Sequence, residues 1–109
     1  MMFFSKIFTI ASFLFGMSYS AHSEDWVVIT PDKQLHWQMA PDGIIYFRNL
    51  DQFNPSFLAC CYNYSLNVTT DRGKAMWSTI LAKTATKENI ILGVANQKAP
   101  GPITYIGQW

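Results

Sequence analysis

Several stretches of the chain have the composition or the two-residue period of β-strands. Residues 26–29 are aromatic and β-branched, and residues 35–39 alternate between apolar and polar side chains. Pro41-Asp42-Gly43 has the chemistry of a hairpin turn, so residues 44–48 are expected to form a strand antiparallel to the one before them.

The clearest alternation lies in residues 62–69. The apolar positions are Tyr62, Tyr64, Leu66 and Val68, and the polar ones are Asn63, Ser65, Asn67 and Thr69. This pattern predicts a strand with one buried and one solvated face. The preceding residues, 49–59, have no period and contain Pro55, so we expect an irregular loop there.

One helix is predicted after this strand. Thr70 is a good N-cap, Asp71 is favourable in the first turn, and residues 74–85 are mostly compatible with a helix. At the helical period, the face expected to pack on the sheet holds Gly73, Met76, Trp77, Ile80, Leu81 and Thr84. The opposite face is small rather than charged and consists of Ala75, Ser78, Ala82 and Ala85.

Two further strands complete the predicted fold. Residues 89–95 are nearly all apolar, as in a strand covered on both sides, and residues 103–106 follow a Pro- and Gly-rich turn. If residues 26–39 form one long bent strand, the chain has five strands, with the helix between the third and the fourth. We therefore expect a mainly β protein with one helix, folded as a five-stranded OB-type barrel.

The first 23 residues have the three parts of a secretory signal peptide. Lys6 precedes an apolar run at 7–17. Ala21 and Ser23 are the small residues of a processing site, so we expect cleavage after Ser23, with cleavage after Ser20 as the alternative. The apolar run is shorter than the roughly 20 residues that span a bilayer. Residues 24–109 should therefore be an OB-fold-like domain, secreted or periplasmic and without membrane insertion.

The charge balance of residues 24–109 argues against two classes of partner. This segment holds all seven Asp and Glu residues and seven of the eight Lys and Arg residues, so it is formally neutral. No basic run is present that would favour nucleic acid or an anionic membrane. A domain of this size has a small core, which a disulfide or an oligomer would supplement.

The only two cysteines, Cys60 and Cys61, are neighbours. Three states are open: a disulfide between neighbours, which closes a strained ring and is uncommon, a disulfide between chains, and two free thiols. Together with His36 they lack the spacing of a zinc site, so we expect no metal.

The candidate catalytic residues have simpler explanations. His36 lies on the polar side of a predicted strand, Asp42 lies in a turn, and Gly73-Lys74 lacks the rest of a phosphate-binding loop. No Gly-x-Ser-x-Gly motif is present. We expect Gly73 to allow close packing of the helix, and we expect neither an enzyme nor a cofactor.

Polar side chains on predicted strands are the candidate ligand contacts: Gln38, Asn63 and Asn67. Exposed aromatic residues would act with them, and the alternative is that these amides only solvate a sheet face. Asn63 and Asn67 also begin Asn-x-Ser/Thr patterns of N-glycosylation, which we discount because both asparagines lie within a predicted strand.

Residues 60–109 resemble a group of small secreted bacterial proteins similar to the B subunit of subtilase cytotoxin. The matching features are a cysteine before an aromatic-rich strand and a helix that leads into an apolar strand. The motifs that match at the start of that helix and within it are Thr70-x-x-Gly73-Lys74-Ala75, Ser78 and Leu81-Ala82-Lys83. The hairpin at 42–47 also fits, but residues 97–100 lack the second cysteine that relatives have there, so the disulfide of the relatives cannot form.

The resemblance implies an OB-fold subunit, and toxin relatives form rings of five that bind host-cell glycans. No glycan-contacting residue of the relatives can be carried over to this sequence. We expect an exported binding protein that recognises a glycan or surface receptor as a homo-oligomer, with a catalytic toxin subunit as a further partner. The alternative is a small exported structural or inhibitory domain without a small-molecule ligand.

The small helix face is the expected oligomer interface. Small side chains let neighbouring helices approach closely, and this face is small rather than charged. Its members are Ala75, Ser78, Ala82 and Ala85.

Overall fold

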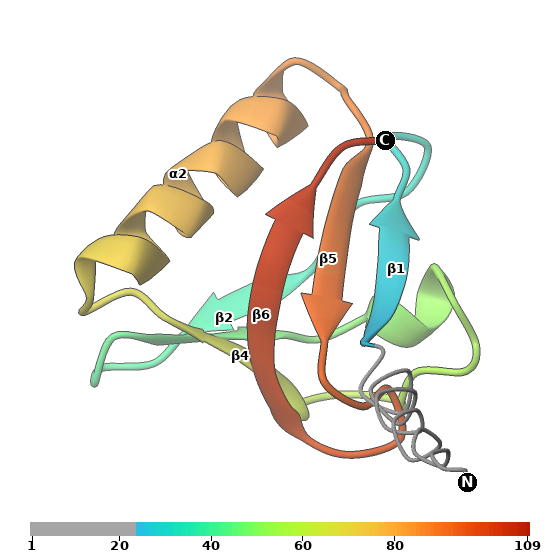
Figure 1. Ribbon diagram of the computed structural model, residues 1–109, viewed down its shortest axis with the longest axis horizontal. Coiled ribbons are helices and arrows are strands. Elements are labelled where there is room, and N and C mark those ends of the chain that lie inside the picture. The colour runs from blue at the N-terminus through green and yellow to red at the C-terminus, as the bar shows by residue number, and fades with distance from the viewer. Residues whose placement is uncertain (1–23) are drawn as a thin grey trace, which may run out of the picture.

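A computed structural model describes residues 24–109, so the predicted signal peptide at 1–23 lies outside the described residues. The described chain is mainly β-sheet with one α-helix (Figure 1). Its elements are β1 (Asp25–Ile29), β2 (Trp37–Met39), β3 (Ile44–Phe47), a 3₁₀ turn (Leu50–Gln52), β4 (Tyr64–Asn67), α2 (Asp71–Ala85), β5 (Ile90–Val94) and β6 (Gly101–Gly107).

The strands form one open, mixed sheet in the order β1-β5-β6-β4-β3-β2. Neighbouring strands are antiparallel except β4 and β6, which are parallel through the pairs Tyr64–Gly101 and Ser65–Pro102. In Figure 1, β1, β5 and β6 run steeply across the view, while β2 and β4 cross it at a large angle. The parallel contact thus joins two differently oriented halves of the sheet.

The prediction of a single bent strand over residues 26–39 is wrong. The structure has two strands there, β1 and β2, at opposite edges of the sheet. Buried Asn49 holds the intervening residues 30–36 out of the sheet: its amide nitrogen donates to the Gln34 carbonyl at 2.8 Å, and its amide oxygen accepts from the His36 N–H at 2.7 Å. The described chain therefore has six strands rather than five, and β1 does not pair with β2.

The strand predicted at residues 44–48 forms as β3, and the alternation predicted for residues 62–69 is confirmed over β4. Ile45 and Phe47 pair with Leu66 and Tyr64, and all four side chains are buried. Every residue of β5 is also buried, as expected for a strand covered on both sides. The core cluster gathers Val27, Ile29, Leu35, Ile45, Phe47, Leu50, Phe57, Tyr64, Leu66, Ile80, Ile90, Leu92, Val94 and Ile103.

The start of α2 forms as the sequence predicts. The Thr70 hydroxyl accepts a hydrogen bond from the Gly73 N–H at 3.0 Å, which caps the helix. A Cβ on Gly73 would lie 1.7 Å from the Asn67 carbonyl oxygen. Only glycine permits this close approach of the helix to the end of β4.

The apolar face of α2 is narrower than predicted. Ile80 is buried, and Met76 and Trp77 are half-buried against the core. Leu81 and Thr84, which the helical period places on the same face, are exposed. The sheet therefore covers a strip of the helix and leaves Leu81 in solvent.

Candidate functional site

The face of β2, β3 and β4 that points away from the core carries polar and aromatic side chains. Gln38 pairs with Tyr46, and Tyr46 pairs with Ser65, so the three lie side by side on one face. Their chain neighbours Ile45 and Leu66 are buried on the other face. We call the face with Gln38, Tyr46 and Ser65 the outer face.

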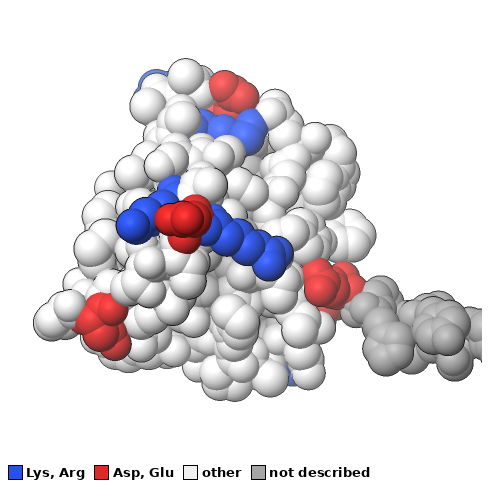
Figure 2. All heavy atoms as spheres, turned by 60° about the vertical axis from the view of Figure 1, so that its left-hand side comes forward, with Lys and Arg blue, Asp and Glu red and all other residues white. Residues whose placement is uncertain are grey.

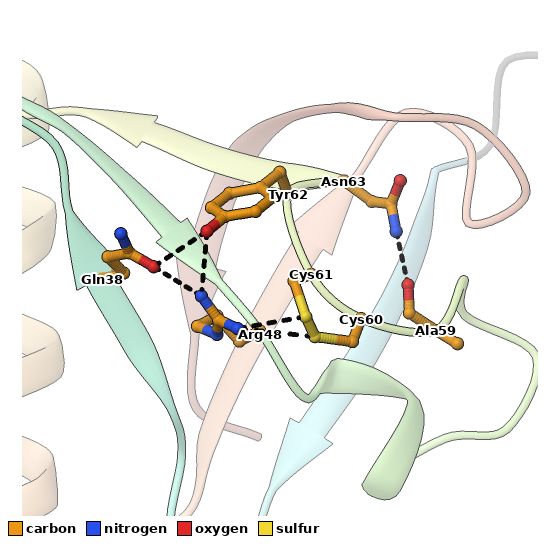
Figure 3. The surroundings of a disulfide bond; sticks show 7 residues. All are labelled: Gln38, Arg48, Ala59, Cys60, Cys61, Tyr62 and Asn63. Carbon is orange, nitrogen blue, oxygen red and sulfur yellow. Dashed lines mark hydrogen bonds between the residues drawn. A yellow bond between two sulfur atoms is a disulfide. The ribbon is translucent and has the colours of Figure 1, made fainter.

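Three side chains, which we call the Arg48 cluster, converge on the outer face: Gln38, Arg48 and Tyr62 (Figure 3). Arg48 Nη1 donates to Gln38 Oε1 and, at 3.2 Å, to the Tyr62 hydroxyl oxygen. The Tyr62 hydroxyl donates to Gln38 Oε1 at 3.2 Å. Arg48 Cζ also lies 5.2 Å from the centroid of the Tyr62 ring, within the range of a cation–π contact.

Tyr62 presents an aromatic ring to solvent. Its side chain is 57% exposed, and its ring meets that of Tyr46 edge to face, with centroids 5.3 Å apart. The prediction that Tyr62 belongs to the buried face is wrong because β4 begins only at Tyr64, so the alternation does not extend back to residue 62. The cluster thus combines an exposed ring with hydrogen-bonding groups.

A disulfide between Cys60 and Cys61 adjoins the Arg48 cluster. Of the three states left open by the sequence, the structure has the bridge between neighbours. Arg48 Nη2 donates to Cys61 Sγ at 3.2 Å and to Cys60 Sγ at 3.8 Å, and Cys60 is exposed. Arg48 therefore contacts the disulfide with one nitrogen and the Gln38–Tyr62 pair with the other.

The guanidinium of Arg48 has only neutral partners within residues 24–109. The ion pair found among these residues lies elsewhere and joins Lys83 to Glu88 at 3.3 Å. The positive charge at Arg48 thus remains uncompensated by a carboxylate of the described chain.

The helix side of the molecule, shown in Figure 2, carries scattered charges of both signs rather than a continuous patch of one sign.

Of the three predicted ligand contacts, only Gln38 lies in the Arg48 cluster. The Asn63 amide donates to the Ala59 carbonyl at 2.5 Å and points away from the cluster (Figure 3). Asn67 lies at the far end of β4, where its amide oxygen accepts from the Thr69 N–H at 2.9 Å. Both asparagines therefore hold local turns.

Sequence reasoning missed Arg48 and Tyr62 as site residues. Arg48 is the one charged residue of the predicted strand 44–48, which was a signal that its side chain leaves the core. The cysteine pair directly before Tyr62 was a signal that the regular alternation begins later. The contact between Arg48 and Tyr62 depends on strand register, which neither signal supplies.

A second exposed aromatic group lies on the other half of the sheet. The Trp109 ring is 6.0 Å from that of Trp26 and 6.1 Å from that of Tyr105. Beneath them is Gly93, where a Cβ would lie 2.1 Å from the Tyr105 ring. Burial raises the pKa of Tyr105, and the negative charges of nearby carboxylates add to this shift.

The predicted oligomer residues of α2 are all exposed. They are Ala75, Ser78, Ala82 and Ala85. Leu81, 44% exposed, extends this face with a large apolar side chain. The helix thus offers a surface of small and apolar residues.

Asp42 and His36, for which the sequence predicts no chemical role, both lie at the surface. The Asp42 carboxylate accepts from the Ile44 N–H at 3.1 Å, which supports its predicted role in the turn. His36 is exposed.

Residues 24–109 contain no group of three or more His, Cys, Asp or Glu side chains placed to hold a metal ion. No helix in this part of the chain is long and apolar enough to cross a membrane.

Comparison with protein-family models, with curated proteins and with solved structures finds no match to this chain. The resemblance to the subtilase cytotoxin B subunit therefore rests on the sequence motifs alone.

Proposed function

We propose that this chain is an exported binding protein, resembling toxin B subunits, that recognises a glycan or surface receptor through the Arg48 cluster and acts as a homo-oligomer. The observation that carries the proposal is the convergence of Gln38, Arg48 and exposed Tyr62 on the outer face. Binding sites commonly combine an apolar or aromatic surface with a few directed polar groups.

The chemistry of the cluster suits a sugar ring. The Tyr62 ring offers an apolar surface for the C–H groups of a pyranose, while the Gln38 amide nitrogen offers N–H donors for its hydroxyls and the Arg48 guanidinium offers a positive charge. Because Arg48 has neutral partners in the described chain, an acidic substituent would gain a charge-assisted hydrogen bond.

The sheet order supports an OB-type barrel as the finer description of the fold. The two edge strands, β1 and β2, are consecutive in sequence, β4 and β6 are parallel, and α2 connects β4 to β5. These features support a sheet that curls into an OB-type barrel, with six strands rather than five. A flat sheet in solution, with no NMR contacts between β1 and β2, would contradict this.

Association through α2 would give the molecule several Arg48 clusters. Weak sugar contacts gain strength when several engage one surface together, because the later contacts form at a high effective concentration. A ring of five and a catalytic toxin subunit are the partners that the resemblance implies, and the exposed small face of α2 supports the ring.

A glycan array of neutral and acidic glycans, probed with the purified mature protein, tests the binding. We expect Tyr62→Ala and Arg48→Ala each to lower the affinity for the bound glycan by about tenfold or more, as for a central contact of an interface. Trp109→Ala is the matched control, because Trp109 is also an exposed aromatic residue but lies on the other half of the sheet.

Loss of binding in Trp109→Ala but not in Tyr62→Ala would move the site to the second aromatic group. An array without any bound glycan would instead favour the alternative function, a structural or inhibitory domain without a small-molecule ligand.

A further inference from the structure

Arg48 physically links the disulfide to the groups that we assign to ligand binding. Its Nη2 atom donates to the sulfur atoms of Cys60 and Cys61, and its Nη1 atom donates to Gln38 and Tyr62. Figure 3 shows the guanidinium between the two sets of partners. A change at the sulfur atoms therefore acts directly on the Arg48 cluster.

The disulfide also fixes the backbone that leads into the cluster. Cys61 directly precedes Tyr62, and the Asn63 amide closes the same turn by donating to the Ala59 carbonyl. With the sulfurs joined, neither cysteine side chain can rotate independently, so the turn presents Tyr62 in one position. Opening the disulfide returns that freedom to both cysteines.

The disulfide is accessible from solvent. Cys60 is exposed and Cys61 is half-buried beside Arg48. A thiolate that attacks Cys60 Sγ expels Cys61 as a thiolate, which the neighbouring guanidinium stabilises. The geometry thus favours attack at the outer sulfur.

We propose that the thiol–disulfide state of Cys60 and Cys61 sets the arrangement of Arg48 and Tyr62 and thereby switches ligand binding: the disulfide form binds, and the dithiol form does not. The part that concerns ligand binding rests on the proposed function.

The chemical step is a two-electron exchange with a dithiol reductant. One reductant thiolate forms a mixed disulfide with Cys60 and releases Cys61. The second reductant thiolate then attacks the reductant sulfur of the mixed disulfide, which closes the disulfide of the reductant and releases Cys60. Two protons pass from the reductant to the cysteines, so the reductant loses two electrons and the protein gains them.

Reduction removes the paired acceptor that now holds Arg48. The two sulfur atoms separate as their side chains rotate, so Nη2 no longer finds both beside it. If either cysteine ionises, its thiolate attracts the guanidinium and draws it away from Gln38 and Tyr62. Both changes disturb the ligand-binding arrangement.

The experiment compares the oxidised protein with the same protein treated with dithiothreitol. The chain has only two cysteines, so the reductant has no other disulfide within the chain to act on. Free-thiol titration and intact mass report the redox state, and NMR of the Arg48 guanidinium and the Tyr62 ring reports the cluster without a ligand. The glycan array, probed with each form, reports binding.

We expect no free thiol in protein isolated without reductant. On reduction, the Arg48 and Tyr62 resonances should shift and the array signal should fall by about tenfold or more. The double variant Cys60→Ser/Cys61→Ser should resemble the reduced form and should not respond to dithiothreitol. Far-UV circular dichroism of each form checks that the sheet remains folded, and a single Cys60→Ala variant replaces the double variant if that fails to fold.

Two free thiols per chain in protein isolated without reductant would overturn the proposal, and so would Arg48 and Tyr62 resonances that reduction leaves unchanged. Equal array binding by both forms would overturn the switch. Resonances that shift on reduction, with no glycan bound by either form, would overturn the proposed glycan recognition but support the link between the disulfide and the cluster.

Discussion

At the scale of single residues, Tyr64 joins three segments of the chain. Its buried hydroxyl accepts from the Leu58 N–H at 2.7 Å and donates to the Gln97 carbonyl at 2.6 Å. Tyr64→Phe leaves both groups without this partner, and we expect it to lower the free energy of unfolding by about 1–3 kcal/mol. Urea denaturation measures the loss. Tyr62→Phe, which removes an exposed hydroxyl, is the control and should change the stability by less than about 0.5 kcal/mol.

The same residue should make the protein sensitive to alkaline pH. Burial raises the pKa of Tyr64 above its usual value, so the folded state keeps the phenol neutral where the unfolded chain already loses the proton. The stabilisation is complete below the unfolded pKa of about 10 and is lost as the pH rises through the folded pKa. Unfolding in urea between pH 8 and 11 should show a decline in stability that is smaller in Tyr64→Phe. Equal declines in both proteins would contradict this prediction.

Gly93 is a second residue that decides local packing, because its lack of a side chain leaves room for the Tyr105 ring. A methyl group there would lie 2.1 Å from the Tyr105 ring, so Gly93→Ala should force the ring to move and cost about 1–3 kcal/mol. Gly101→Ala is a matched control in the neighbouring strand, because a Cβ at residue 101 meets no atom within 4 Å. Thermal melts of the two variants compare the costs, and a double variant Gly93→Ala/Tyr105→Ala should recover part of the loss. Similar melting temperatures for Gly93→Ala and the wild type would contradict the close packing.

At the scale of elements, the start of α2 depends on the Thr70 cap. Thr70→Ala removes the acceptor of the Gly73 N–H and should destabilise the protein by about 0.5–2 kcal/mol. Thr70→Ser keeps the hydroxyl and should retain most of the stability, as measured by urea denaturation. A loss in Thr70→Ser equal to that in Thr70→Ala would show that the hydroxyl is not what matters.

Local patterns predicted the elements that local chemistry determines. The cap and the alternation in β4 needed only near neighbours in sequence, and both were predicted. The end of β1 has a local signal, because Pro31 and Asp32 form a turn directly after it. The placement of β2 at the opposite edge of the sheet depends on long-range pairing, and the Asn49 contacts to Gln34 and His36 span about fifteen residues, so no local pattern indicates that placement. For the same reason the sequence indicated Gln38 as a ligand contact but not its neighbours Arg48 and Tyr62, which strand register and the disulfide turn bring to it.

At the scale of the whole molecule, the small exposed residues of α2 are the basis for predicting self-association. A solvent-exposed helix face normally carries charge along its length, whereas this one carries Asp71 in its first turn and then small residues, and the cations Arg72, Lys74 and Lys83 lie beside it. Burying this face between copies removes exposed apolar surface such as Leu81 from water, which stabilises a domain with a small core. The charged side chains at its borders could remain solvated in such an assembly.

Light scattering at micromolar concentration should give a mass several times that of the monomer. Ala82→Glu should lower this mass, because the interface would bury an unpaired carboxylate. Ala95→Glu, which places the same charge at an exposed position after β5, is the control and should leave the mass unchanged. If the protein binds glycan, Ala82→Glu should bind a dense glycan surface more weakly than the wild type does. Its affinity for a single soluble glycan should be unchanged, because only binding to the dense surface depends on several Arg48 clusters. A strictly monomeric wild type would remove the ring and, with it, the case for multivalent binding.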